Sequence, residues 1–198
     1  MFFPYKDDNP RVLFPYVTYA IIGLNILVFL GQFYLYDNAS MIATFAFIPY
    51  EFKLFTIFTS MFMHGGIMHI IGNMWFLYIF GDNVESILGH ARYLYFYLFC
   101  GAGAAVAQFL IEPYSTTPMV GASGAIAGVL GAYMIKFPKA RVHVLAVIFI
   151  FITTIVVPAQ FVLGLWFLMQ LSGGLGSLGF DTTAVSYTHL TLPTNREV

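Results

Sequence analysis

Long apolar runs, separated by short polar segments, dominate this chain of 198 residues. A helix that crosses a bilayer needs about 20 mostly apolar residues, and five runs fit that length. They lie at residues 16–35, 59–80, 92–112, 119–137 and 143–170. The last run is long and contains Pro158, which predicts a kink or an interfacial end. The sequence therefore predicts an all-α, polytopic membrane helix bundle.

The composition agrees with a membrane protein. Hydrophobic residues make up 60% of the chain and charged residues only 9%, whereas an ordinary soluble domain carries about 25% charged residues. The chain therefore lacks the polar side chains that cover a water-facing surface, and membrane lipids are expected partners. The formal net charge is -1, so nucleic acid is not an expected partner. Cys100 is the single cysteine, which excludes an internal disulfide, and its apolar surroundings predict a buried, inert thiol.

One membrane domain is expected over residues 1–180. No small-residue cleavage site follows the first run, so it is predicted to stay as a spanning helix rather than act as a signal peptide. Residues 36–58 are rich in aromatic side chains and are predicted to form a structured loop at the membrane surface. Residues 181–198 contain many polar residues and Pro193 and no long apolar run, so they are predicted not to span.

Lysine and arginine predict the orientation, because they gather on the cytoplasmic side of membrane proteins. A cytoplasmic N-terminus puts Lys53 outside and the following residues inside: Lys6, Arg11, Arg92, Lys136, Lys139 and Arg141. This bias predicts that residues 81–91 and 137–142 are cytoplasmic. The beginnings of the predicted spans 59–80 and 119–137 then lie at the outer side.

Three polar residues interrupt the predicted span 59–80, namely His64, His69 and Asn73. Such residues are costly in a membrane and mark a function or a water-filled cavity by default. His69 and Asn73 are four residues apart, so they share one helical face. The pattern suits a metal site, N–H donors aimed at an oxyanion, or hydrogen bonds between helices. A metal site needs more ligands than the spans offer, so neither a metal nor a cofactor is expected.

A serine lies between glycines near the start of the predicted span 119–137, in Gly121-Ala122-Ser123-Gly124. At the outer end of a helix, Ser123 would lie among unpaired N–H groups and the positive end of the helix dipole, which both suit an oxyanion. Small residues at three- and four-residue spacing also let another helix approach closely. They are Gly124, Ala127, Gly128 and Gly131. From these residues alone, Ser123 is either a nucleophile or one more small packing residue.

Taken together, these segments resemble the rhomboid family of intramembrane serine proteases. The similar segments are "FPYVTYAIIGLNILVF", the His-x4-His-x3-Asn arrangement, "GASGAIAGVLGAY" and "VPAQFVLGLWFLMQLSGG". They agree with the family in order and spacing over about residues 12–180. The resemblance implies a compact bundle with an outward-opening cavity, of which five of the six core spans are present. It also implies hydrolysis of peptide bonds in or near the transmembrane segments of a protein substrate.

The resemblance implies roles for the residues that match the family's motifs. Ser123 matches the nucleophile, and His69 and Asn73 match the side chains of the oxyanion hole. Gly121 and Gly124 form the backbone of the serine motif, and His64 matches a neighbouring histidine with a less direct role. The implied location is the bacterial inner membrane, with a cytoplasmic N-terminus and an active site that opens outward.

The general base of the family is a histidine on a sixth span, in an Ala-His-x-x-Gly-like context. Residues 181–198 hold only His189, in "SYTHLTLPT", which lacks the glycines and the apolar length. His90 and His143 flank predicted cytoplasmic loops, on the wrong side. The sequence therefore predicts that this chain lacks its base and is inactive. It also predicts that the tail is not native to the family, as in a truncated gene.

Two other classes of function compete with a protease. A non-catalytic rhomboid-like protein would bind transmembrane clients without cutting them, but such a protein has no need of Ser123, His69 and Asn73 together. A small transporter or channel would need acidic residues in mid-membrane or paired half-helices, and the spans show neither. The residues favour the protease over both.

Overall fold

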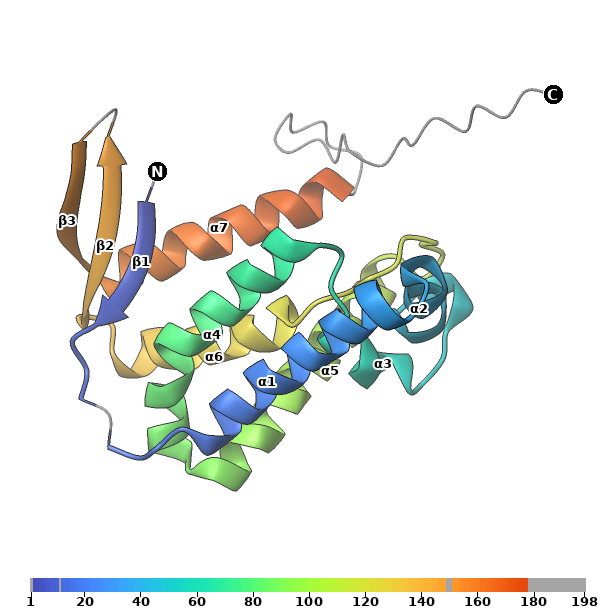
Figure 1. Cartoon of the computed structure of the whole chain (residues 1–198), viewed down its shortest axis with the longest axis horizontal. Helices are drawn as coiled ribbons and strands as arrows, with labels where there is room; N and C mark the ends of the chain where they lie inside the picture. Colours follow the sequence, from blue (N-terminus) through green and yellow to red (C-terminus); the bar gives the residue numbers. More distant parts are fainter. Residues whose placement is uncertain (1, 11, 149–150, 178–198) are drawn as a thin grey trace. The chain divides into compact units, whose positions relative to one another are not determined.

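Among the described residues before Ala159, four helices of 14 or more residues form the framework (Figure 1). They are α1 (Tyr16–Leu30), α4 (Ile67–Leu88), α5 (His90–Ile111) and α6 (Ser123–Lys136). The structure is a computed structural model, and it describes residues 2–10, 12–148 and 151–177. The chain divides into two units, residues 1–163 and 164–198. Helix α7 (Ala159–Ser177) begins in the first unit and continues into the second.

The helices follow the predicted apolar runs, which confirms a helical membrane bundle. Within the described residues, two helices are long and apolar enough to cross a membrane: Tyr16–Tyr34, with a mean hydropathy of 1.6, and His90–Ile111, with 1.7. The first of these continues α1 through a π-helical turn, η1 (Gly31–Leu35). Ser123–Lys136 and Ala159–Gln170 are shorter apolar helices. The predicted runs 16–35, 92–112 and 119–137 are thus helical over most of their length.

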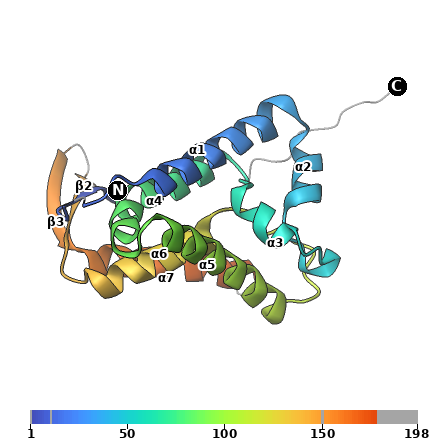
Figure 2. The same cartoon turned by 90° about the horizontal axis from the view of Figure 1, so that it is seen from below.

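Helix α6 packs against both α4 and α5, and α1 packs against α4 (Figure 2). Glycines allow the close contact with α5, because a Cβ on Gly124 would overlap the Cβ of Ala104. A Cβ on Gly128 would overlap the Sγ of Cys100 in the same way, and that thiol is half-buried rather than buried. The predicted small-residue contact is therefore present at these two glycines. Gly131 takes no part, since nothing lies within 4 Å of its Cβ position.

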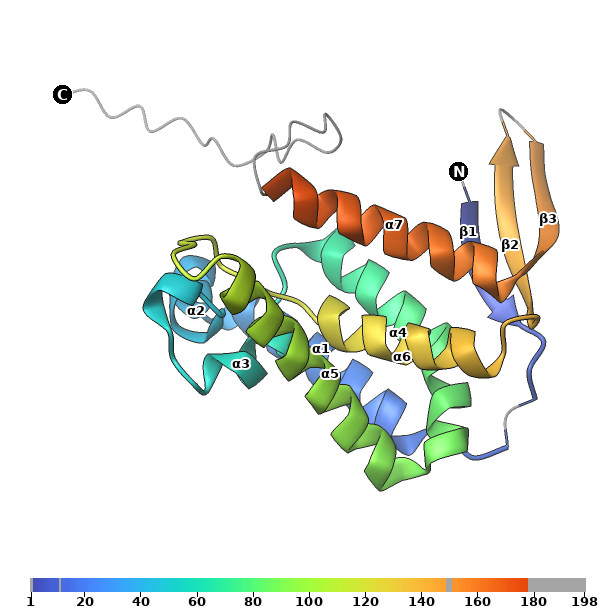
Figure 3. The same cartoon turned by 180° about the vertical axis from the view of Figure 1, so that it is seen from behind.

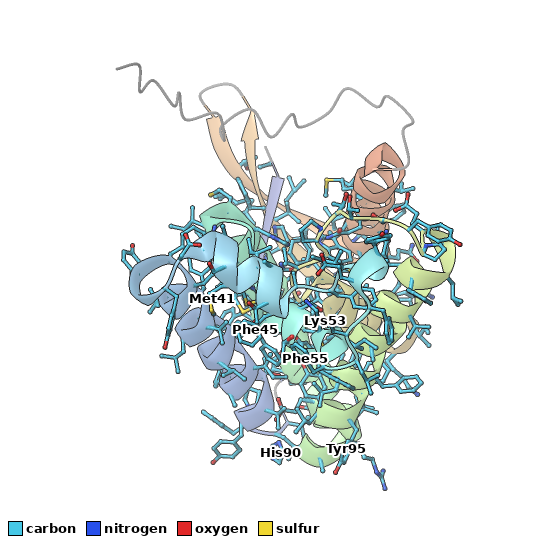
Figure 4. The ribbon with its side chains drawn as sticks, turned by 90° about the vertical axis from the view of Figure 1, so that its right-hand side faces the viewer. Met41, Phe45, Lys53, Phe55, His90 and Tyr95 are labelled. Carbon is cyan, nitrogen blue, oxygen red and sulfur yellow. The ribbon has the colours of Figure 1, made fainter. Side chains whose placement is uncertain are left out.

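The segment between α1 and α4 is structured, as predicted. It contains α2 (Asn38–Phe45), η2 (Pro49–Glu51), α3 (Thr56–Thr59) and η3 (Ser60–Phe62). The Asp37 carboxylate caps α2 by accepting the N–H of Ser40 at 2.8 Å. Figure 4 views this segment from the side, with Met41 and Phe45 of α2 labelled. Its position at the membrane surface stays a prediction.

The predicted span 143–170 differs from the structure. Its first half is instead a hairpin of β2 (Arg141–Ile148) and β3 (Phe151–Pro158), and helix begins only at Ala159. With β1 (Phe2–Asp7) the hairpin makes an antiparallel sheet in the order β1-β2-β3. Both segments are apolar, but valine, isoleucine and threonine predominate, and these β-branched residues favour strands. Hydropathy alone does not distinguish such a run from a spanning helix.

The predicted span 59–80 also differs, because its helix starts at Ile67 and continues to Leu88. Gly65 and Gly66 precede the helix, and glycine is a poor helix former. His64 therefore lies in the connection after η3, not on the helix with His69 and Asn73. The predicted tail 181–198, with His189, lies outside the described residues.

Candidate active site

Ser123 is the first residue of α6, at the end of a tightly held segment. Phe47 and Met119 exchange two backbone hydrogen bonds, of 3.1 and 2.8 Å, and the N–H of Gly121 donates to the carbonyl of Ser60 at 2.9 Å. Gly121 has a φ of 112°, a conformation that favours glycine. These contacts fix the backbone that leads into Ser123, and the serine itself is half-buried.

The backbone N–H groups at the start of α6 are available to a ligand. The N–H of Ile126 is the first to donate within the helix, to the carbonyl of Ala122 at 2.9 Å, so the N–H groups of residues 123–125 have no acceptor within the helix. No side chain caps this helix end in the described structure. A negatively charged group near Ser123 would meet these donors and the positive end of the α6 dipole.

His69 and Asn73 of α4 both face the backbone just before Ser123. A Cβ on Gly121 would stand 2.7 Å from the Nε2 atom of His69 and 3.5 Å from the Nδ2 atom of Asn73. The two predicted donors therefore converge on the Gly121-Ala122-Ser123 turn from one face of α4. The shared face is what their four-residue spacing predicted, and their roles in an oxyanion hole stay a prediction.

A hydrogen bond on the far side of the His69 ring favours one tautomer. The backbone N–H of Gly65 donates to the Nδ1 atom of His69 at 3.4 Å, which favours the tautomer with Nδ1 unprotonated. In a neutral imidazole the proton then lies on Nε2. His69 therefore presents an N–H donor toward Gly121.

Asn73 presents a second donor. Its side chain is buried, with 6% exposed, and its Nδ2 atom has no hydrogen-bond partner among the described residues. An unpaired buried N–H group costs about 1–3 kcal/mol, and native proteins pair almost all such groups. A donor left open beside a serine motif is therefore available to a bound substrate oxygen.

His64 packs against the His69 ring, and Gln32 forms hydrogen bonds to the backbone of His64. The rings of His64 and His69 meet edge to face, with centroids 5.2 Å apart. The Gln32 side chain accepts the His64 N–H at 3.2 Å and donates to the His64 carbonyl at 2.7 Å. Gln32 lies in the π-helical turn η1 and is fully buried, and such turns are frequent at functional sites. The sequence analysis missed Gln32, although a glutamine inside an apolar run was a signal for it.

The two remaining described histidines bind carboxylates instead of the serine motif. His90 Nδ1 lies 2.6 Å from the Glu85 carboxylate, and His143 Nε2 lies 2.7 Å from that of Asp8. Glu85 is twelve residues beyond Asn73 on α4, about 18 Å along the helix. Among the described residues no group of three or more histidine, cysteine, aspartate or glutamate side chains could hold a metal ion.

A hollow on the outside of α5 contains none of the predicted site residues. Its volume is about 590 Å³ and its lining is apolar. The lining residues are Phe58, Tyr95, Phe96, Leu98, Phe99 and Ala102. Figure 4 labels Tyr95 on this side of the molecule. The predicted chemistry therefore depends on the α4–α6 contact, not on this hollow.

Comparison with known proteins identifies relatives over most of the chain. The family model described as "Rhomboid domain" matches residues 51–190. "Rhomboid protease GluP" of Bacillus subtilis is 34% identical over 129 residues, covering 61% of this chain and 24% of that protein. The human "Presenilin-associated rhomboid-like protein, mitochondrial" is 29% identical over 192 residues, covering 90% of this chain and 50% of that protein. This chain thus spans between about a quarter and half the length of these two relatives.

Proposed function

Because this chain belongs to the rhomboid family of integral membrane proteins, we propose that its site is that of an intramembrane serine endopeptidase. Ser123 is the nucleophile, and the substrate is a peptide bond in or near a transmembrane segment of another protein. The proposal goes beyond family membership, since a member of this fold could also bind transmembrane clients without cutting them.

The convergence of two open N–H donors on the serine motif carries this proposal. When Ser123 Oγ attacks a carbonyl carbon, the carbonyl oxygen becomes negative. The Nδ2–H of Asn73, the Nε2–H of His69 and the backbone N–H of Ser123 then stabilise it. The first two groups face Gly121 already, and Asn73 has no competing partner in the described structure. One such donor is typically worth about 10²–10³ in rate.

The reaction also needs a base, because a serine hydroxyl is a weak nucleophile until its proton is removed. His69 is committed to the oxyanion through Nε2, and His90 and His143 bind carboxylates. We propose that the base is a histidine on a further apolar span, as the family resemblance implies. It takes the Ser123 proton and passes it to the leaving amine, and water then hydrolyses the acyl-enzyme.

The distribution of charge supports an active site on the outer side. Arg92 follows the end of α4, and Lys136, Lys139 and Arg141 lie at or after the end of α6. Ser123 is at the opposite end of α6, and these basic residues suit the cytoplasm. The serine motif then lies at the opposite, outer end of the bundle, where water can enter. The proposed location is the bacterial inner membrane, with the N-terminus in the cytoplasm.

Covalent labelling tests the proposed function. A fluorophosphonate reacts with an activated serine, so the full-length protein is expected to be labelled at Ser123. Ser123→Ala abolishes this labelling. The control Ser60→Ala leaves the labelling in place, because Gly121 bonds to the backbone carbonyl of residue 60, which alanine keeps. A folded protein that binds a transmembrane peptide and resists the label at Ser123 would be a client-binding protein instead.

A further inference from the structure

One carboxylate oxygen joins the helix of the nucleophile to the helix of the oxyanion donors. The Oδ2 atom of Asp7, at the end of β1, accepts a hydrogen bond from the Tyr133 hydroxyl of α6 at 2.5 Å. The same oxygen accepts a second bond, from the Asn83 Nδ2 of α4, at 3.0 Å. Tyr133 is fully buried and Asn83 is 3% exposed. Hydrogen bonds to a charged acceptor at a buried position are stronger than neutral ones.

The two donors lie at matched distances from the site. Tyr133 follows Ser123 by ten residues on α6, and Asn83 follows Asn73 by ten residues on α4. At 1.5 Å per residue, each donor is about 15 Å along its helix from the group in the site. Because α4 and α6 pack against each other, a bond that fixes their far ends also limits how they slide at the near ends.

The strand that carries Asp7 is itself held in place. The indole N–H of Trp75 on α4 donates to the Pro4 carbonyl at 2.6 Å, and Asn9 donates to the Tyr133 hydroxyl at 2.7 Å. Strand β1 also pairs along β2, with Asp7 opposite Val142. Figure 3 shows β1 beside β2. Asp7 is therefore a fixed anchor rather than part of a loose terminus.

We propose that Asp7 is a positioning residue that sets the register of α6 against α4, and so the distance between Ser123 and the Asn73 donor. The roles of Ser123 and Asn73 rest on the proposed function, but the mechanical link does not. Asp7 touches no substrate, and it acts through Tyr133 and Asn83. A chain without this link keeps its helices and loses the alignment of their outer ends.

Amide hydrogen exchange in detergent micelles tests the link without requiring activity. The reporters are the N–H groups of Gly121 and Ile126, whose bonds to Ser60 and Ala122 define the serine turn. Asp7→Ala is expected to speed their exchange about tenfold, because local opening sets the exchange rate. Asp7→Asn keeps an oxygen that accepts both bonds and is expected to stay near the wild-type rate.

Asp8→Ala is the matched control, since Asp8 is the neighbouring acidic residue and its carboxylate is exposed and paired with His143. Wild-type exchange at both reporters in Asp7→Ala would overturn the proposal, and so would equal acceleration in Asp8→Ala or Asp7→Asn. If Asp7→Ala does not fold, Tyr133→Phe removes the Asp7 bond to α6, together with the bond from Asn9, and leaves the Asp7 bond to Asn83, so a smaller acceleration at the same amides is expected. Fluorophosphonate labelling of Ser123 reports separately on the proposed function, so the two can fail independently.

Discussion

The imidazole of His69 lies against the backbone of Gly121, so closely that a Cβ at residue 121 would stand 2.7 Å from its Cε1 and Nε2 atoms. Gly121 also has a φ of 112°, which disfavours any residue with a side chain. The glycine before the serine is thus required for two reasons, one of backbone conformation and one of space.

The first prediction concerns this contact. Gly121→Ala forces the His69 ring or the serine turn to move, and a misplacement of about 1 Å in a catalytic site can cost roughly 10² in rate. The rate of Ser123 labelling by a fluorophosphonate should fall by about that factor. Gly131→Ala is the control, since nothing lies within 4 Å of its Cβ position and its φ is ordinary. Equal labelling of the Gly121→Ala variant and the wild type would contradict the proposed site.

The second prediction separates function from stability at Asn73. Its Nδ2 donor has no partner among the described residues, so Asn73→Ala breaks no hydrogen bond at that atom. The labelling rate should fall by about 10²–10³, the usual worth of one oxyanion donor. The free energy of unfolding should change by less than about 1 kcal/mol or rise, because an unsatisfied buried group is removed. A large loss of stability with an unchanged labelling rate would assign Asn73 a packing role only.

The third prediction concerns the start of α1. The buried Glu85 carboxylate accepts the N–H groups of Val17 and Thr18 at 2.9 and 2.8 Å, and the Thr18 hydroxyl at 2.6 Å. Glu85→Ala leaves these donors unpaired and should lower the free energy of unfolding by about 2–4 kcal/mol. Glu51→Ala breaks only the exposed ion pair with Lys53 and should cost less than about 1 kcal/mol. Denaturation of both variants in mixed micelles measures the difference. Equal losses would show that the hydrogen bonds to Glu85 do not stabilise the start of α1.

The fourth prediction concerns pH and Asp7. Burial raises the pKa of the Asp7 carboxyl above its ordinary value of 3.8, and nearby Asp82 adds to this, while the hydrogen bond from Tyr133 opposes it. The folded protein therefore binds this proton more tightly than the unfolded chain does. This tighter proton binding adds to the free energy of unfolding. The addition is complete below pH 3.8 and is lost as the pH rises through the raised pKa of Asp7.

Asp7→Asn cannot titrate, so its unfolding free energy should depend less on pH across this window than that of the wild type. Measurement of both proteins from about pH 3.5 to about pH 7 gives the comparison. A wild-type curve that rises with pH relative to the Asp7→Asn curve would show a lowered pKa and contradict the burial argument.

Three of the helices, and the shared helical face of His69 and Asn73, could be predicted because their signals are local. Apolar runs gave α1, α5 and α6, and four-residue spacing placed His69 and Asn73 on one face. The hairpin 141–158 was missed because β-branched strands and spanning helices have similar hydropathy. The prediction that His64 lies on the helix is wrong, because Gly65 and Gly66 are poor helix formers and the helix begins only at Ile67.

Other features of the site arise from contacts between distant parts of the chain. Gln32 bonds to His64, and Asp7 bonds to Asn83 and Tyr133, across 32, 76 and 126 residues respectively. No periodicity or spacing in a single sequence encodes such pairs. Their polar types inside or beside apolar runs mark them as unusual, but only the fold shows which residues they bind.

Labelling at a single residue tests the central claim most directly. The full-length protein is incubated with a fluorophosphonate, and the adduct is mapped by mass spectrometry. The account predicts one phosphonyl group, on Ser123, which Ser123→Ala abolishes and Asn73→Ala slows. A folded protein that stays unlabelled at Ser123, or that carries the adduct elsewhere, would contradict it.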